Sequence, residues 1–236
     1  MDDHAFHTDI FFDVDSTIVT FEGIDYLGEQ KGVGEDVTRL TDLAMNGKLR
    51  MEQVFEEKIN LVSPSKKELQ TLSHIYLTNM TPGAEVVMEI LTSLNKKVYL
   101  ISGGFLDAIL PLSRKLGLPK KNIFANRISF KADGKFDSLD MGNPLVTSQG
   151  KKTIISKLKI GKNAAFIGDG ATDLTTASIV KTFIGFGGVA KRTSIREKAE
   201  HYITEKNLIP VLRYILTPQE KNYVIKSHPH IRRFFY

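Results

Sequence analysis

The chain of 236 residues contains no cysteine. Without thiols it can form neither a disulfide framework nor a thiolate metal site, and it has no cysteine nucleophile. Any metal that it binds must therefore use oxygen or histidine ligands. With 42% hydrophobic and 25% charged residues, the composition is otherwise that of an ordinary globular protein.

Long hydrophobic runs are lacking as well. No apolar stretch of the sequence approaches the ~18 residues that would span a membrane. The first residues, Met1-Asp2-Asp3-His4, are acidic, whereas a secretory signal begins with basic residues. We therefore expect no membrane partner and a cytoplasmic location.

The charge balance is uneven along the chain. The formal net charge is +5, which suits an anionic ligand without identifying one. In the basic C-terminal tail, residues 218–236, four basic side chains oppose the single acidic Glu220: Lys221, Lys226, Arg232 and Arg233. The tail is either a contact for an acidic partner, nucleic acid or a second subunit, or a solvated terminus. We favour the solvated terminus, so nucleic acid is not an expected partner, and a homodimer is left open.

Hydrophobic periodicity predicts an α/β fold that a helical segment interrupts. Ile10-Phe11-Phe12 has the pattern of a buried strand, and from residue 80 onward helix and strand patterns alternate, as in a parallel sheet. We expect a doubly wound, Rossmann-like, mostly parallel sheet in a discontinuous core, residues 1–18 and 80–236, with a helical cap over 19–79. Helices of the cap are expected over Glu35–Met45, Met51–Leu61 and Lys66–Tyr76.

The core should contain a regular series of elements. A β-hairpin is expected over Ile123–Lys135, because Ala132-Asp133-Gly134 in its middle is a turn sequence. The other expected elements are helix Glu85–Leu94, strand Lys97–Ile101, helix Leu106–Leu116, helix Lys152–Leu158, strand Ala164–Ile167, helix Leu174–Ile179, strand Thr182–Gly185 and a last helix over Leu208–Leu216.

Four polar motifs occur where predicted strands end or helices begin. They are Asp13-Val14-Asp15, Ser102-Gly103-Gly104, Gly150-Lys151 and Gly168-Asp169-Gly170-Ala171-Thr172-Asp173. Each motif alone has an ordinary structural explanation, such as a helix cap, a turn or a solvated lysine. Together they supply carboxylates, a hydroxyl, glycine amides and an ammonium to one crevice, which favours a site for phosphate and metal.

The first motif predicts the chemistry. Two carboxylates one residue apart need a cation, and an oxygen-seeking metal such as Mg²⁺ would neutralise them. Asp13 would then attack phosphorus and form an aspartyl-phosphate. Asp15 would protonate the leaving alcohol and later deprotonate the hydrolytic water.

The remaining motifs predict supporting roles. Ser102 and the amides at Gly103 and Gly104 would bind phosphoryl oxygens, and Lys151 would oppose the negative charge of the transition state. Two further carboxylates would complete the metal site: Asp169 as a ligand, and Asp173 by orienting a metal-bound water or Lys151.

These motifs resemble those of the haloacid-dehalogenase-like phosphatases and, among them, the phosphoserine phosphatases. The resemblance runs from about residue 8 to 216, and the tail lies outside it. It implies that Mg²⁺ is bound by Asp13, the backbone carbonyl of Asp15, and Asp169, and that the helical cap closes over the substrate. Thr172, in the last motif, joins the expected substrate-binding residues.

The resemblance also implies how substrate is recognised. Glu22 would receive the amino group of phosphoserine, and Met45 stands where the family has a lid methionine. Two positions depart from the family pattern. Lys58 replaces an arginine that grips the serine carboxylate, keeping the charge but losing the planar fork. Asn46 replaces the glycine that follows the lid methionine. The resemblance further suggests that Arg192 reaches the site.

The sequence thus predicts a Mg²⁺-dependent phosphatase that converts O-phospho-L-serine to serine and phosphate. Within enzymes, the alternatives are another small phosphorylated substrate, or phosphoryl transfer to an acceptor alcohol. A signalling receiver domain is disfavoured because its phosphorylated aspartate would end a middle strand, where this chain has Ser102. An inactive scaffold is disfavoured because every expected catalytic residue is present.

Overall fold

A six-stranded parallel sheet forms the centre of the protein. The computed structural model describes residues 7–46, 48–158, 160 and 163–236. The strands lie in the order β3-β2-β1-β6-β7-β8, and neighbouring strands run parallel. Their bounds are β1 (Asp9–Phe12), β2 (Lys97–Phe105), β3 (Ile123–Asn126), β6 (Ala164–Gly168), β7 (Thr182–Phe186) and β8 (His201–Ile203). The order reverses beside β1, so the doubly wound prediction is confirmed, and a ligand crevice is expected where β1 ends.

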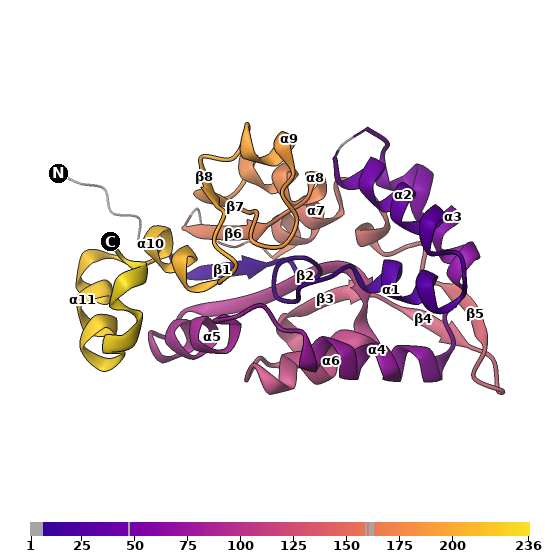
Figure 1. Cartoon of the computed structure of the whole chain (residues 1–236), viewed down its shortest axis with the longest axis horizontal. Helices are drawn as coiled ribbons and strands as arrows, with labels where there is room; N and C mark the ends of the chain where they lie inside the picture. Colours follow the sequence, from indigo (N-terminus) through magenta and orange to yellow (C-terminus); the bar gives the residue numbers. More distant parts are fainter. Residues whose placement is uncertain (1–6, 47, 159, 161–162) are drawn as a thin grey trace.

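Both faces of the sheet are covered. Ile10 and Phe12 of β1 belong to one buried cluster, while Phe11 between them belongs to another on the opposite face, as the alternation of a strand requires. Helices α5 (Ala84–Ser93) and α6 (Leu106–Lys115) pack on the first face, and α7 (Gly150–Lys157) and α9 (Thr193–Arg196) on the second (Figure 1). This double burial explains why β1 is a continuous apolar run.

A helical segment lies beyond the carboxyl end of β1 (Figure 1). It contains α1 (Gly23–Gln30), α2 (Gly34–Met45), α3 (Met51–Val62) and α4 (Lys66–Thr78); the last three match predicted helices, and α1 is additional. The two chain segments that join it to the core are hydrogen-bonded to each other: Thr20 N donates to Asn79 O at 3.0 Å, and Thr81 N donates to Ile18 O at 2.8 Å. The division of the chain into core and cap stays a prediction.

Two predicted core elements are wrong. The stretch Ile123–Asn126 is not part of a hairpin but the parallel edge strand β3, and the hairpin joins β4 (Ile128–Phe130) to β5 (Phe136–Leu139). The expected helix Leu174–Ile179 is replaced by α8 (Ala171–Leu174) and the 3-10 turn Thr175–Ser178. Hydroxyls in this turn bond to carbonyls three residues back, which tightens the helix into a 3-10 geometry. The other 3-10 turns are Lys120–Asn122, Pro144–Val146, Ile209–Val211 and Pro229–Phe234.

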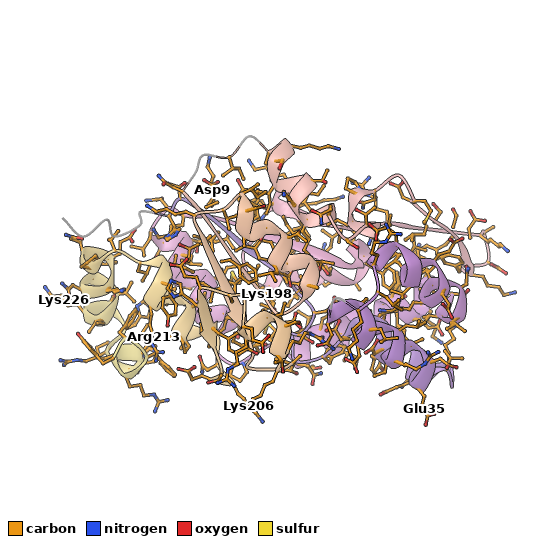
Figure 2. The ribbon with its side chains drawn as sticks, turned by 90° about the horizontal axis from the view of Figure 1, so that it is seen from above. Asp9, Glu35, Lys198, Lys206, Arg213 and Lys226 are labelled. Atoms are coloured by element: carbon orange, nitrogen blue, oxygen red, sulfur yellow. The ribbon has the colours of Figure 1, made fainter. Side chains whose placement is uncertain are left out.

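The basic tail is folded, so the expectation of a solvated terminus is wrong. After α10 (Leu212–Ile215), which takes the place of the predicted last helix, the chain forms α11 (Pro218–Ser227). Val224 and Ile231 are buried in the core, and Glu220 pairs with the buried ammonium of Lys96 at 2.7 Å. Figure 2 shows Lys226 of α11 at the opposite end of the molecule from Glu35 of α2. The tail is therefore part of the core, remote from the helical segment.

None of the helices in the described parts of the chain combines the length and apolar character needed to cross a membrane.

Candidate active site

Asp13 and Asp15 lie where β1 gives way to a sharp turn. Asp13 N still donates to Ile167 O at 2.9 Å, which continues the pairing with β6. Three residues later Ser16 adopts a φ of 53°, a left-handed conformation that is strained for a non-glycine residue. The two carboxylates thus have different neighbours: Asp13 contacts Lys151, and Asp15 contacts Tyr76 and Ser102.

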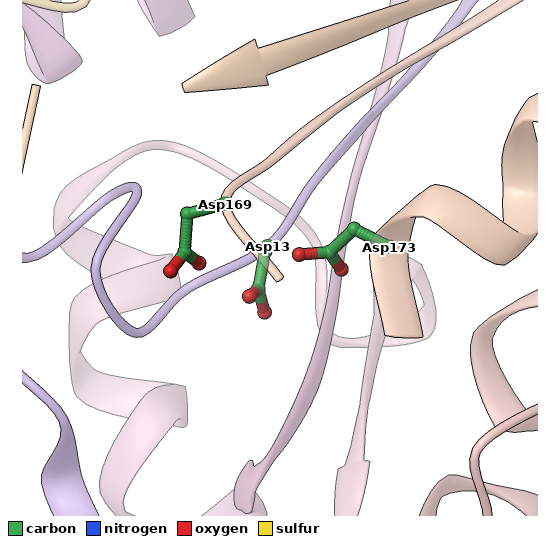
Figure 3. A group of neighbouring side chains, drawn as sticks. All are labelled: Asp13, Asp169 and Asp173. Atoms are coloured by element: carbon green, nitrogen blue, oxygen red, sulfur yellow. The ribbon is translucent and has the colours of Figure 1, made fainter. Parts of the chain in front are cut away.

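Three buried carboxylates converge at the ends of β1 and β6. Oxygen atoms of Asp13, Asp169 and Asp173 all lie within 4.8 Å of one another, and Figure 3 shows the three side chains facing a common space. Glycine is required at position 168, because a Cβ there would collide with the carboxyl group of Asp173. A buried set of oxygen donors of this kind suits a hard divalent cation.

Lys151 joins two of these carboxylates. Its Nζ lies 2.7 Å from Oδ1 of Asp13 and 2.5 Å from Oδ1 of Asp173. Burial lowers the pKa of Lys151, but the charges of both aspartates outweigh it and raise the pKa above its usual value. Lys151 is therefore a permanent cation beside Asp13. The second oxygen of Asp173 accepts from Gly170 N at 2.9 Å, so Asp173 is held in contact with Lys151. That it orients Lys151 or a metal-bound water stays a prediction.

The concentration of negative charge is visible in the carboxyl pKa values. Burial, followed by the charge of Asp173, raises the pKa of Asp13 well above its usual range. Burial and the charge of Glu22 raise the pKa of Asp169 to about 8. A nearby cation stabilises the anionic form of buried carboxyl groups such as these and lowers their pKa values.

Asp15 is held by three donors. Its Oδ1 accepts from Tyr76 Oη at 2.7 Å and from Gly23 N at 2.8 Å, and its Oδ2 accepts from Ser102 Oγ at 3.2 Å. Burial, then the charge of Glu22, raises the pKa of Asp15 to about 6. A carboxyl group with this pKa can both give and take a proton near neutral pH.

The phosphate-binding loop predicted after the strand Lys97–Ile101 lies beside Asp15. Its residues fall within β2, which continues to Phe105, at the place where the pairing with β3 is irregular. Ser102 is fully buried, and its hydroxyl also accepts from Gly104 N at 2.8 Å. Asn126 of β3 donates to Gly103 O at 2.8 Å and so fixes the backbone of the loop. The sequence did not single out this role of Asn126, because the contact joins residues of two different strands.

These groups surround a cavity of about 50 Å³. Among the residues that line it are the predicted site residues Asp13, Asp15, Glu22, Lys58, Gly103, Gly104, Lys151 and Thr172. Asn46 lies elsewhere, with its amide donating to Asp42 O at 2.8 Å. The prediction for Met45 concerns a side chain outside the described part of the chain.

Lys58 of α3 presents a buried cation to the cavity. Only 3% of its surface is exposed, and burial lowers the pKa of Lys58 despite the attraction of Asp25 and Glu22. Within the described residues, no hydrogen bond or ion pair engages its ammonium group. Asp25 itself accepts a short hydrogen bond from Thr41 Oγ1. This arrangement crosses three helices, and no local sequence signal indicates it.

Arg192 links Asp169, which follows β6, to the helical segment. Its Nε lies 2.9 Å from Oδ2 of Asp169, and its Nη atoms lie 3.3 Å from Glu22 and 3.5 Å from Asp42. This position agrees with the suggestion, drawn from the family resemblance, that Arg192 reaches the site. A second contact of the helical segment joins Glu52 of α3 to Ser148, because Glu52 accepts from Ser148 N at 2.8 Å and from Ser148 Oγ at 2.7 Å.

A family model for haloacid dehalogenase-like hydrolases matches residues 10–179. The chain belongs to the haloacid dehalogenase-like hydrolases. The phosphoserine phosphatase of Bos taurus is 36% identical over 199 residues, covering 83% of this chain and 88% of that protein. The Homo sapiens phosphoserine phosphatase is 37% identical, with the same coverage. A solved structure described as a phospho-aspartyl intermediate analogue of phosphoserine phosphatase superposes with a TM-score of 0.78 at 30% identity, covering 89% of this chain and 100% of that one.

These likenesses identify the chain as a phosphoric monoester hydrolase of the haloacid dehalogenase-like family. Small phosphorylated molecules are therefore its substrate class. The receiver-domain and inactive-scaffold alternatives are incompatible with this assignment. For a haloacid dehalogenase-like hydrolase, the acidic group at the ends of β1 and β6 is well suited to hold a metal ion.

Proposed function

We propose that the protein hydrolyses O-phospho-L-serine to serine and inorganic phosphate, with Mg²⁺ as cofactor and Asp13 as the phosphorylated residue. One observation carries the proposal. The cavity that contains Asp13 and Lys151 is also lined by Glu22 and Lys58. Phosphoserine carries a phosphate, an amino group and a carboxylate, and the cavity offers groups of the required charge for each.

The metal would be held by carboxylate oxygens of Asp13 and Asp169 together with the backbone carbonyl of Asp15. An all-oxygen set is the type that Mg²⁺ prefers. When bound, Mg²⁺ supplies positive charge that offsets the carboxylates and polarises the phosphoryl group. Asp173 would act beside this set, since its oxygens already bond to Lys151 and Gly170 N.

Two steps follow from the positions of the two aspartates. In the first, a carboxylate oxygen of Asp13 bonds to phosphorus, the bond from phosphorus to the serine oxygen breaks, and that oxygen takes a proton from Asp15. In the second, water gives a proton to Asp15 and attacks phosphorus, releasing Asp13 and phosphate. Lys151 opposes the charge that develops on the phosphoryl oxygens, and Ser102 with the Gly103 and Gly104 amides orients them.

Substrate recognition would fall to the helical segment. The ammonium of Lys58 would bind the serine carboxylate, and Glu22 would accept the amino group. Burying an unpaired ammonium is costly, so an anion from the substrate would relieve an existing penalty. Thr172 also faces the cavity and would contact the phosphate.

We propose that residues 19–79 act as a cap on the core formed by 1–18 and 80–236. Arg192, through Asp42, and the pair Glu52–Ser148 connect the helical segment to the core at two places. Closing these contacts over substrate would exclude water from the reaction. A homodimer and a cytoplasmic location stay predictions.

A second candidate is hydrolysis of another small phosphomonoester. It is favoured by Lys58 and Asn46 at positions where the resemblance to phosphoserine phosphatases implies arginine and glycine. Transfer of the phosphoryl group to an acceptor alcohol is a further possibility with the same first step.

The test is phosphate and serine production from O-phospho-L-serine beside a panel of other phosphomonoesters, with Mg²⁺ or with EDTA and without added alcohol. The proposal expects Mg²⁺-dependent release with phosphoserine as the preferred substrate. Preference for another ester would support the second candidate. Release only with an acceptor alcohol would indicate transfer, and no release from any ester would refute the proposed function.

A further inference from the structure

Tyr76, a residue of the helical segment, places its hydroxyl against the carboxyl group of Asp15, the proposed acid and base. It belongs to α4, and its Oη donates to Oδ1 of Asp15 at 2.7 Å, across 61 positions of sequence. The tyrosine is fully buried and lies behind Asp15, outside the set of residues that line the cavity. Tyr76 therefore touches the acid/base and not the substrate.

The two oxygens of Asp15 have different surroundings. Oδ1 accepts two hydrogen bonds, from Tyr76 Oη and Gly23 N, whereas Oδ2 accepts one, from Ser102 Oγ. A carboxylate oxygen has two lone pairs, so Oδ1 is saturated and Oδ2 keeps one lone pair for a proton. Oδ2 is also on the side of the phosphate-binding loop, because a Cβ on Gly104 would lie 2.9 Å from it.

The position of the hydroxyl is fixed by packing. The ring of Tyr76 is tilted against Phe21, with centroids 5.4 Å apart. Glycine at position 23 leaves room for the hydroxyl, since a Cβ there would collide with Tyr76 Oη. Gly23 thus contributes both a second donor to Oδ1 and the space that Tyr76 needs.

We propose that Tyr76 is a positioning residue for the reaction. Together with Gly23 N it saturates Oδ1 of Asp15, so that Oδ2 is the atom that gives a proton to the leaving alcohol and takes one from water. The inference rests on the proposed function, because it presupposes that Asp15 is the acid/base. In this role Tyr76 affects only the steps in which Asp15 gives or takes a proton.

The test compares two substrates that differ in their need for an acid. The alcohol of O-phospho-L-serine must be protonated as it leaves, whereas p-nitrophenyl phosphate releases a stable anion. If phosphorylation of Asp13 is the first irreversible step, kcat/KM reports the rate of that step. For Tyr76→Phe we expect kcat/KM to fall about tenfold with phosphoserine, which is less than the roughly 10²- to 10⁴-fold contribution of a whole acid–base group because Asp15 itself remains. With p-nitrophenyl phosphate it should stay within about twofold.

Tyr99→Phe is the matched control. Tyr99 also donates to an aspartate, Asp9 Oδ1 at 3.2 Å, but away from the cavity, so its loss should leave both substrates unaffected. Gly23→Ala is a second route to the same defect, because the added methyl displaces the Tyr76 hydroxyl. The losses from Tyr76→Phe and Gly23→Ala should not add in the double variant, since both remove one hydrogen bond.

Equal slowing of both substrates by Tyr76→Phe, or no slowing of either, would overturn the role of Tyr76. The same conclusion would follow if Gly23→Ala left the ratio of the two kcat/KM values unchanged. Failure of the proposed function gives a different result, in which the wild-type enzyme with Mg²⁺ does not cleave O-phospho-L-serine, whether or not it cleaves p-nitrophenyl phosphate.

Discussion

Arg192 donates from Nε to Oδ2 of Asp169 at 2.9 Å. One of the carboxylates proposed to bind Mg²⁺ is thus already paired with a cation. The same guanidinium contacts Glu22 and Asp42 of the helical segment. The candidate metal site and the helical segment are therefore connected through a single side chain.

Replacing Arg192 should strengthen metal binding. In Arg192→Ala, a positive charge beside Asp169 is lost, and we expect the dissociation constant of Mg²⁺ to fall by roughly threefold to tenfold. Calorimetric titration of the substrate-free protein measures it. Arg213→Ala, which breaks an Arg–Glu pair at 3.1 Å outside the site, is the control. Weaker Mg²⁺ binding by Arg192→Ala would mean that Arg192 instead holds Asp169 in place.

Changing Lys58 to arginine should improve phosphoserine binding. The planar guanidinium can bond a carboxylate in two places, where an ammonium acts as a point charge. One additional charge-assisted hydrogen bond would lower KM by roughly tenfold, with kcat little changed. The control is Lys31→Arg, because Lys31 pairs with Glu68 at 3.1 Å outside the cavity. Steady-state kinetics that show no decrease in KM for Lys58→Arg would contradict contact between Lys58 and the carboxylate.

Asp25 should give folding stability a pH dependence. Burial raises the pKa of Asp25 from 3.8 to about 6 in the folded protein. The raised pKa means that the stability contributed by its protonated form is complete below 3.8 and is lost as the pH rises through about 6. Asp25→Asn removes this loss, so the variant should gain stability relative to wild type between pH 4 and pH 8, by about 1 kcal/mol after allowance for solvent screening.

Denaturant unfolding of wild type and Asp25→Asn at several pH values measures this difference. Other carboxyl groups titrate in both proteins, so only the difference between them reports Asp25. Asp36→Asn on α2, a position with 64% side-chain exposure, is the control for losing one negative charge. A stability difference that shrinks as the pH rises would contradict the raised pKa.

The contact between Lys96 and Glu220 should stabilise the folded tail. The Lys96 side chain is 2% exposed, so removing the charge of Glu220 takes away charge compensation from a buried cation. In Glu220→Gln the single amide oxygen can accept from Thr217 N or from Lys96 but not from both, and we expect the variant to cost about 2 kcal/mol in urea unfolding. Glu85→Gln breaks a pair whose side chains are each 54% exposed and should cost less than about 1 kcal/mol. Equal losses for the two variants would refute a structural role for this pair.

The strand-end residues could be predicted because their positions follow from local sequence. Asp13 and Asp169 come directly after buried parallel strands, Ser102 lies near the carboxyl end of another, and such ends meet at one edge of the sheet. Lys151, near the start of a helix, was found by its place in the same series of motifs. The structure brings these four side chains into one region without exception.

Contacts between the helical segment and the core could not be predicted in this way. Tyr76 meets Asp15 and Arg192 meets Glu22 across long stretches of sequence, and periodicity identifies the helices but not how they face the core. The tail was misjudged because its net charge was given more weight than its capping box, Thr217 with Glu220. That signal, with Pro218 at the first helical position, predicts a helix start.

Acid quenching of the Mg²⁺-loaded enzyme during turnover of radiolabelled O-phospho-L-serine tests the central claim most directly. The account predicts acid-stable, hydroxide-labile label on the peptide that contains Asp13 in the wild-type protein, and none in Asp13→Asn. Label on another residue, or rapid phosphate release by Asp13→Asn, would contradict the assignment of Asp13 as the residue that takes the phosphoryl group of phosphoserine.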